Sequence, residues 1–176
     1  MAMRSFRREQ RGVAVAMAIA LGITIVALGL AATLDRGAAQ VPFALRLRSA
    51  LRADLLVIGW LAATIANVAR LRFLSERDIA GSAGEAGSDE VRRAGAILQN
   101  TLEQVVPAVC AHMIVAATFA RPEPLVWTMA GLFAIGRLLF WAGYRRGATG
   151  RALGFGLTFY PSVAGLIAAA AVMLAG

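Results

Sequence analysis

The sequence has no lysine, one cysteine, one histidine and few charged residues of any kind. Charged residues make up 16% of its 176 residues and hydrophobic residues 59%, whereas an average soluble domain has about 25% charged and about 45–50% apolar residues. This balance excludes an intrinsically disordered chain, a nucleic-acid-binding tail protein and an ordinary cytosolic enzyme. The formal charge of +8, carried by 18 arginines against 10 acidic residues, still needs an explanation.

Cysteine and histidine are too few for the sites that these residues usually build. The single Cys110 cannot form an intrachain disulfide, and together with His112 it cannot complete a tetrahedral metal site. We therefore expect no bound metal, and we expect His112 to form a hydrogen bond with a neighbouring helix. The sequence also lacks a phosphate-binding loop, a dinucleotide-binding glycine pattern and a Gly-x-Ser-x-Gly motif.

Long apolar runs dominate what is present. Each has at most one charged residue and, with its flanks, is long enough to cross about 30 Å of hydrocarbon as a helix. The five runs are 12–34, 55–69, 94–120, 124–144 and 152–176. The first is longer than the apolar core of a signal peptide, about 7–15 residues, and no convincing cleavage site follows it. The runs predict an all-α integral membrane protein with five spanning helices, the first of them retained.

The arginines fall mainly on one side of this topology. Twelve lie on the N-terminal side: Arg4, Arg7, Arg8, Arg11, Arg70, Arg72, Arg77, Arg92, Arg93, Arg145, Arg146 and Arg151. The positive-inside rule then predicts a cytoplasmic N-terminus and an outside C-terminus. Most of the positive charge is thus explained by topology, without nucleic acid as a partner. Arg46, Arg48 and Arg52 cluster on the opposite side, where we expect an interfacial helix.

Glu103 is an acidic residue inside an apolar run, where an acid costs about 2.5–3.5 kcal/mol at the helix centre. At 100° per residue, Arg93, Asn100 and Glu103 lie on one helix face. Such a stripe can bind a polar ligand from the basic side. The alternative is an interhelical seam, for example an ion pair between Glu103 and Arg137.

A second group of polar residues lies where the fourth run ends. Arg137 and Tyr144 share a helix face, and Arg145, Arg146 and Arg151 follow closely. These guanidinium groups can bind a carboxylate or phosphate, or hold a thiol as thiolate. The alternative is that they set the topology and contact lipid phosphates.

Three stretches in order resemble the MAPEG family, the membrane-associated proteins in eicosanoid and glutathione metabolism. AILQNTLEQ at 96–104 is similar to the family's Asn-x-x-Glu helix, and GRLLFWAGY at 136–144 with RALGF at 151–155 is similar to its third and fourth core helices. Residues 70–79 resemble the end of its first core helix. The resemblance implies a four-helix transmembrane bundle over 51–176, preceded at 1–50 by a basic tail, one additional transmembrane helix and a connection. It also implies a homotrimer that binds glutathione between subunits near the cytosolic surface.

The resemblance also implies roles for particular residues. Arg151 matches the catalytic arginine that stabilises the glutathione thiolate, and Arg137 a supporting arginine of the third core helix. The residues implied to bind glutathione are Arg70, Arg93, Asn100, Glu103 and Tyr144. Among these, Asn100 and Glu103 would contact its backbone and amino group, and Arg70 and Arg93 its carboxylates.

Three positions depart from the family pattern. Ala96 stands where active members usually carry an arginine, Ala152 replaces a serine of one branch, and Phe140 replaces a tyrosine or histidine. Losing a bidentate carboxylate contact costs about 1.5–3 kcal/mol of binding. Two hypotheses follow. One is a glutathione transferase or peroxidase that attacks lipophilic electrophiles or hydroperoxides, with glutathione as co-substrate. The alternative is a non-catalytic lipid-binding or scaffold trimer. The arginine-rich, lysine-free composition favours a bacterial inner membrane as its location.

Overall fold

The apolar runs form helices that extend beyond the runs into their polar flanks. The computed structural model describes residues 2–34, 40–80 and 87–175, and the side chains from Phe6 onward. Its elements are α1 (Ala2–Thr33), α2 (Phe43–Phe73), α3 (Asp89–Thr118), α4 (Glu123–Gly143), the short 3-10 helix η1 (Tyr144–Arg146) and α5 (Gly147–Ala175). No strand occurs in these described ranges.

Four stretches are long and apolar enough to cross a membrane, and the last contains two helices. This last stretch, Glu123–Ala175, has 53 residues and comprises α4, η1 and α5. Even α4, with 21 residues, is about 31 Å long at 1.5 Å per residue, enough for the hydrocarbon core. The predicted all-α integral membrane fold is confirmed. The expectation of a separate interfacial helix is wrong, because Arg46, Arg48 and Arg52 lie in the first turns of α2, which is continuous from Phe43 to Phe73.

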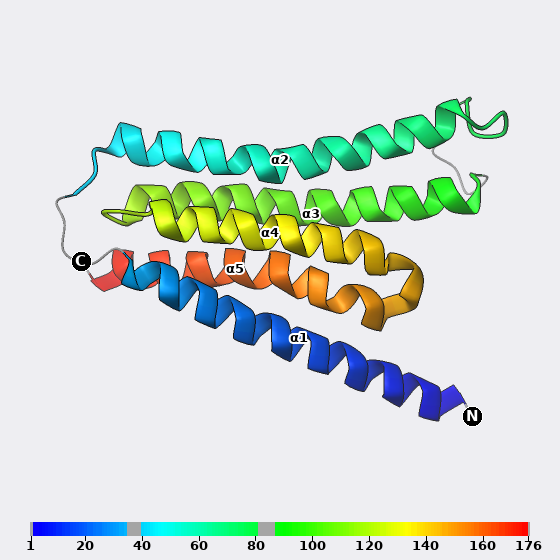
Figure 1. Cartoon of the computed structure of the whole chain (residues 1–176), viewed down its shortest axis with the longest axis horizontal. Coiled ribbons are helices and arrows are strands. Elements are labelled where there is room, and N and C mark those ends of the chain that lie inside the picture. The colour runs from blue at the N-terminus through cyan, green and yellow to red at the C-terminus, as the bar shows by residue number, and fades with distance from the viewer. Residues whose placement is uncertain (1, 35–39, 81–86, 176) are drawn as a thin grey trace.

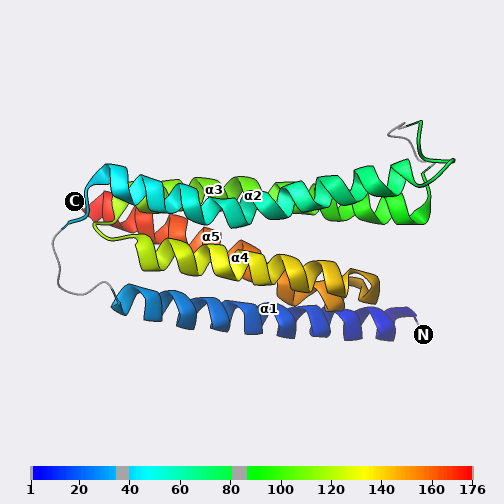
Figure 2. The same ribbon diagram turned by 45° about the horizontal axis from the view of Figure 1, so that its top comes forward.

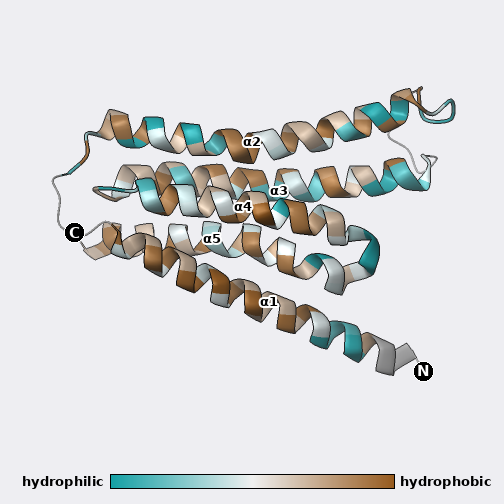
Figure 3. Ribbon diagram, in the orientation of Figure 1, coloured by the Kyte–Doolittle hydropathy of each residue, from teal (hydrophilic) through white to brown (hydrophobic). Residues whose placement is uncertain are grey.

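The helices lie side by side and successive ones run in opposite directions (Figures 1 and 2). One end of the bundle carries the N-terminus, the connection after α2 and the turn between α4 and α5 (Figure 1). Hydrophilic residues gather at this end (Figure 3). It holds the twelve arginines that the sequence places together, so we call it the basic end. Its cytoplasmic placement remains a prediction.

The additional helix α1 packs on α5 at the side of the bundle (Figure 2). Ala20 is fully buried against this surface, and a side chain at Gly156 of α5 would collide with it. At the basic end, the Glu9 carboxylate accepts a hydrogen bond from the Ala148 backbone N–H at 3.3 Å. Most of the other large apolar side chains of α1 are exposed, as expected for a lipid-facing helix. The helix α1 is therefore attached to the bundle along one narrow face.

Glycines bring α4 and α5 into close contact. A Cβ at Gly136 would lie 2.8 Å from the Gly154 carbonyl oxygen, and one at Gly143 would overlap the Gly150 backbone. Small residues allow this approach between membrane helices, where packing rather than the hydrophobic effect drives association. Gly150 and Gly154 form a Gly-x-x-x-Gly pair that sequence analysis overlooked.

A polar pair joins α2 and α3 inside the bundle. His112 Nδ1 and Asp54 Oδ1 lie 2.6 Å apart, and both side chains are buried. The expected hydrogen bond from His112 to a neighbouring helix is confirmed.

Candidate functional site

The first cavity at the basic end is lined mainly by polar and charged side chains. It has a volume of about 480 Å³, and its polar lining comes from Asn67, Arg70, Glu90, Arg93, Tyr144 and Arg145. Arg70 lies in the last turn of α2 and Arg93 at the start of α3. Because α2 and α3 are antiparallel neighbours, these two predicted glutathione ligands line the same space. We call it the cationic cavity, since its arginines outnumber its one acidic residue.

The connection before α3 is held by Asp78, which sets where this helix begins. The Ser88 backbone N–H donates to Asp78 Oδ1 at 2.9 Å, and the Ser75 hydroxyl donates to Oδ2 at 2.7 Å. The hydrogen bonds from Ser88 and then from Ser75 lower the pKa of Asp78 below its usual value. Ser88 is also the N-cap of α3, where its hydroxyl accepts from Val91 N–H. These contacts orient the first turns of α3, which carry Arg93.

The second cavity at the basic end has a largely apolar lining. It measures about 420 Å³ and lies among α1, α3, α4 and α5. Val13 and Met17 of α1, Ala96 of α3, and Phe140 and Phe155 supply apolar surface. Its polar members are Asn100, Tyr144 and Arg151. We call it the apolar cavity.

Tyr144 lines both cavities, and Arg151 lies over its ring. The Arg151 guanidinium carbon is 4.7 Å from the centroid of the Tyr144 ring, a cation–π distance. Tyr144 begins η1, and Gly147 follows with φ of 77°, a left-handed conformation that glycine adopts without strain. This turn brings the first residues of α5, including Arg151, back beside Tyr144.

Arg137 is buried behind the apolar cavity, with only 2% of its surface exposed. It donates to Asn100 Oδ1 at 3.0 Å and to Thr158 Oγ1 at 2.8 Å. Its guanidinium also lies 4.5 Å from the centroid of Phe140, whose ring makes an edge contact with Tyr144. Arg137 therefore connects α3, α4 and α5 and supports the residues in front of it.

Glu103 lies outside both cavities. Its carboxylate is exposed and accepts a hydrogen bond from the Gln99 side chain at 3.0 Å. The alternative of an ion pair between Glu103 and Arg137 is wrong, because Arg137 donates instead to Asn100 and Thr158. Of the predicted site residues, the structure groups Arg70 with Arg93 and Asn100 with Arg151, and Tyr144 lines both cavities.

Several lining residues were not identified from the sequence. Asn67 and Glu90 line the cationic cavity, and Val13 and Met17 form a wall of the apolar one. No local pattern marks Val13 and Met17, since they resemble any lipid-facing residue of an apolar helix. In the described ranges no three His, Cys, Asp or Glu side chains are grouped as a metal site.

The fold and these cavities define an integral membrane protein, an all-helical bundle with a cationic and an apolar cavity meeting at one end. The model of the MAPEG family matches residues 50–171, which comprise nearly all of α2 to α5 and leave α1 outside. The chain belongs to the MAPEG family, and is thus a membrane protein of the glutathione and eicosanoid metabolism family. No curated protein and no solved structure matches it significantly.

Proposed function

We propose that the protein is a glutathione transferase or peroxidase, with glutathione bound at the cationic cavity and a lipophilic second substrate in the apolar one. One observation carries the proposal: Tyr144, with Arg151 over its ring, forms a wall of both cavities. A thiol bound at this wall would face an apolar substrate entering from the bilayer.

Charge supports the assignment of the peptide to the cationic cavity. Arg70, Arg93 and Arg145 line it, with Glu90 as the one acidic residue among its lining side chains. Glutathione has two carboxylates and one amino group at neutral pH, so this combination of cations and one acid complements it. The volume of about 480 Å³ lies in the range of about 300–1,000 Å³ that is usual for small-molecule sites.

Arg151 would supply the chemistry. Its guanidinium stabilises the negative sulfur as the thiol releases its proton to water at the basic end, which lowers the pKa of the bound thiol. The thiolate then attacks an electrophilic carbon in the apolar cavity, and the C–S bond forms as the leaving group departs with its electron pair. With a hydroperoxide it attacks the outer oxygen, so that an S–O bond forms, the O–O bond breaks and the departing alkoxide takes a proton from water. A second glutathione reduces the resulting sulfenic acid, which gives glutathione disulfide and water. Holding both reactants against Tyr144 replaces a bimolecular encounter with a positioned one.

The variant Arg151→Ala tests this role. We expect it to lose most of the thiolate absorbance that appears in the ultraviolet when glutathione is added to the purified unmodified protein, because the stabilising cation is gone. Arg146→Ala is the matched control, since Arg146 is an exposed arginine of the same turn that lines neither cavity. If the unmodified protein shows no thiolate signal with glutathione, the proposal fails.

A second candidate is a non-catalytic lipid-binding or scaffold trimer. It is favoured by the position of Glu103, which is exposed on α3 and lies outside both cavities of its own subunit. An acid on a spanning helix needs a polar neighbour, and a second subunit would supply one. We extend both proposals to a homotrimer in a bacterial inner membrane with the basic end in the cytoplasm, in line with the positive-inside rule.

A further inference from the structure

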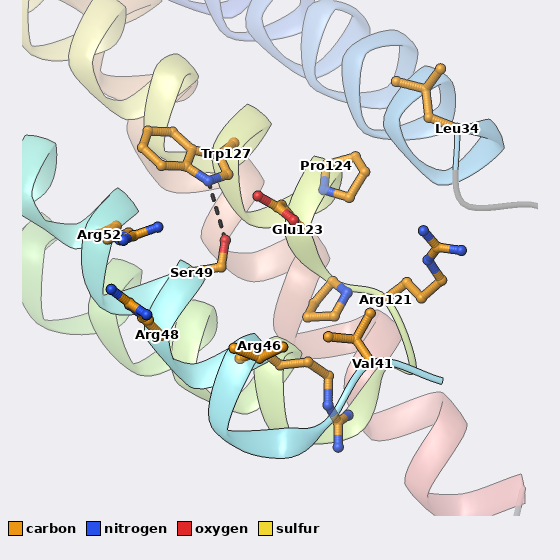
Figure 4. A pocket seen from close by; sticks show the side chains of 12 residues that line it. Leu34, Val41, Arg46, Arg48, Ser49, Arg52, Arg121, Glu123, Pro124 and Trp127 are labelled. Atoms are coloured by element: carbon orange, nitrogen blue, oxygen red, sulfur yellow. Dashed lines mark hydrogen bonds between the residues drawn. The ribbon is translucent and has the colours of Figure 1, made fainter. Parts of the chain in front are cut away.

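Figure 4 shows a third cavity, lined by residues at the end of α1, the start of α2 and the start of α4. These helix ends lie at the opposite end of the bundle from the basic end (Figure 1). The cavity measures about 450 Å³. Its polar and aromatic lining includes Arg48, Ser49, Arg52, Arg121, Glu123 and Trp127.

Two of its arginines are available to a ligand. Arg48 and Arg52 are four residues apart on α2, so they share a helix face, and both are exposed. Neither has a hydrogen-bond or ion-pair partner among the described residues. Both side chains lie on the same side of the cavity, across from Arg121 (Figure 4).

Ser49, which follows Arg48 in α2, adds a hydroxyl group beside these arginines. Its hydroxyl oxygen accepts the indole hydrogen of Trp127 at 3.2 Å. The hydroxyl hydrogen therefore remains free to donate to an anion. Two guanidinium groups and a hydroxyl on one helix face form a donor set suited to phosphate oxygens.

Hydrogen bonds between the start of α2 and the end of α3 fix the backbone around these three donors. Arg46 is buried and donates to the Ala117 and Phe119 carbonyls at the end of α3, at 3.3 and 2.6 Å. The Val41 N–H donates to the Ala120 carbonyl at 3.1 Å, which joins the start of α2 to the turn after α3. The cavity is thus built on fixed backbone rather than on a loose surface.

Apolar side chains complete the cavity and point to an amphiphile. Leu34 and Leu45 line it and are 77% and 54% exposed, respectively. Trp127 is 40% exposed close to a helix end, a position typical of the membrane interface. A free phosphate would use only the cations, whereas an anionic lipid would also cover the leucines with its acyl chains.

We propose that this cavity binds the phosphate head group of an anionic phospholipid, with Arg48, Ser49 and Arg52 as donors. Glu123 is the one acidic residue among the lining side chains, and it opposes an anion there. The site is separate from the proposed glutathione site and does not depend on it.

Native mass spectrometry of the full chain in neutral detergent tests the proposal, with phosphatidylglycerol as the probe. We expect the double variant R48Q/R52Q to bind phosphatidylglycerol at least about tenfold more weakly, as expected for losing charge-assisted hydrogen bonds. The control R7Q/R11Q removes two exposed arginines with the same spacing from the other end of the bundle, and its binding should stay within about twofold. The variant E123Q should strengthen binding, because it removes the opposing charge.

Other outcomes overturn the proposal. Equal loss in R48Q/R52Q and R7Q/R11Q would show charge attraction without a site, and weaker binding by E123Q would contradict the electrostatic argument. If the unmodified protein bound phosphatidylcholine as strongly as phosphatidylglycerol, an anionic head group would not be required. Displacement of the lipid by a similar concentration of inorganic phosphate would assign the site to free phosphate. Thermal unfolding of each variant verifies that it is folded.

Discussion

Arg137 shows how one side chain can organise the basic end. It is buried within the spanning helices, yet its guanidinium has polar partners on α3 and α5 and an aromatic ring on its own helix. Burying a cation is costly unless hydrogen bonds and neighbouring π faces compensate. The residue that accepts from it, Asn100, also lines the apolar cavity, so the position of that side chain depends on Arg137.

We expect Arg137→Ala to lower the free energy of unfolding by about 2–4 kcal/mol, since it leaves the Asn100 oxygen without its donor and opens a cavity. Denaturant unfolding in mixed micelles measures this. Arg146→Ala, an exposed arginine nearby, should change stability by less than about 0.5 kcal/mol. Equal stability of the two variants would show that the buried hydrogen bonds contribute nothing.

At the scale of elements, α4 and α5 depend on glycines for their contact. Gly154 faces the backbone of Phe140, and Gly143 faces that of Gly150, with no space for a methyl group in either place. The same turn carries Tyr144 and Arg151, so the distance between these two residues follows from how closely the helices approach.

Gly154→Ala should therefore destabilise the protein by about 1–3 kcal/mol, the usual cost of overpacking. Gly131→Ala is the matched control on α4, because nothing lies within 4 Å of a Cβ placed there. It should stabilise by up to about 1 kcal/mol through helix propensity. Unfolding midpoints of both variants, measured in the same micelles, give the comparison. A harmless Gly154→Ala would mean that the two helices can separate freely.

At the scale of the whole molecule, Glu103 lines neither the cationic nor the apolar cavity of the chain. Its described hydrogen bond is to Gln99 on the same helix, one turn away. A carboxylate exposed to lipid would cost a few kcal/mol, so we expect this face of α3 to meet another subunit. A site between subunits would let Glu103 reach the amino group of glutathione bound to a neighbouring copy.

The variant Glu103→Gln separates the two proposed functions. We expect an intact trimer by light scattering in detergent, with the thiolate signal of added glutathione lost, because the amide keeps hydrogen bonding but lacks the charge. Glu76→Gln, an exposed acid outside both cavities, should retain both properties. Dissociation of the trimer by Glu103→Gln would instead favour the scaffold.

Local features of the chain are enough to predict the fold class, the membrane-spanning runs and the family. Run length sets whether a helix can cross a bilayer, and arginine position indicates which ends lie together; neither depends on how helices pack. Arg46, Arg48 and Arg52 mark a polar end in the same way, although they belong to α2 and do not form a separate helix.

Only the packing of the helices decides which polar groups meet. Arg137 lies 37 residues from Asn100 and 21 from Thr158, and its partners depend on the rotation of three helices about their axes. Val13 and Met17 line the apolar cavity because a small residue of α5, Gly156, allows α1 to pack closely against it. The positive charge noted at the outset is thus an indicator of topology along most of the chain. Tertiary contacts alone decide which arginines line a cavity: Arg70 and Arg93 line the cationic cavity, and Arg151 lines the apolar one. A cavity is made by distant segments and therefore has no local pattern.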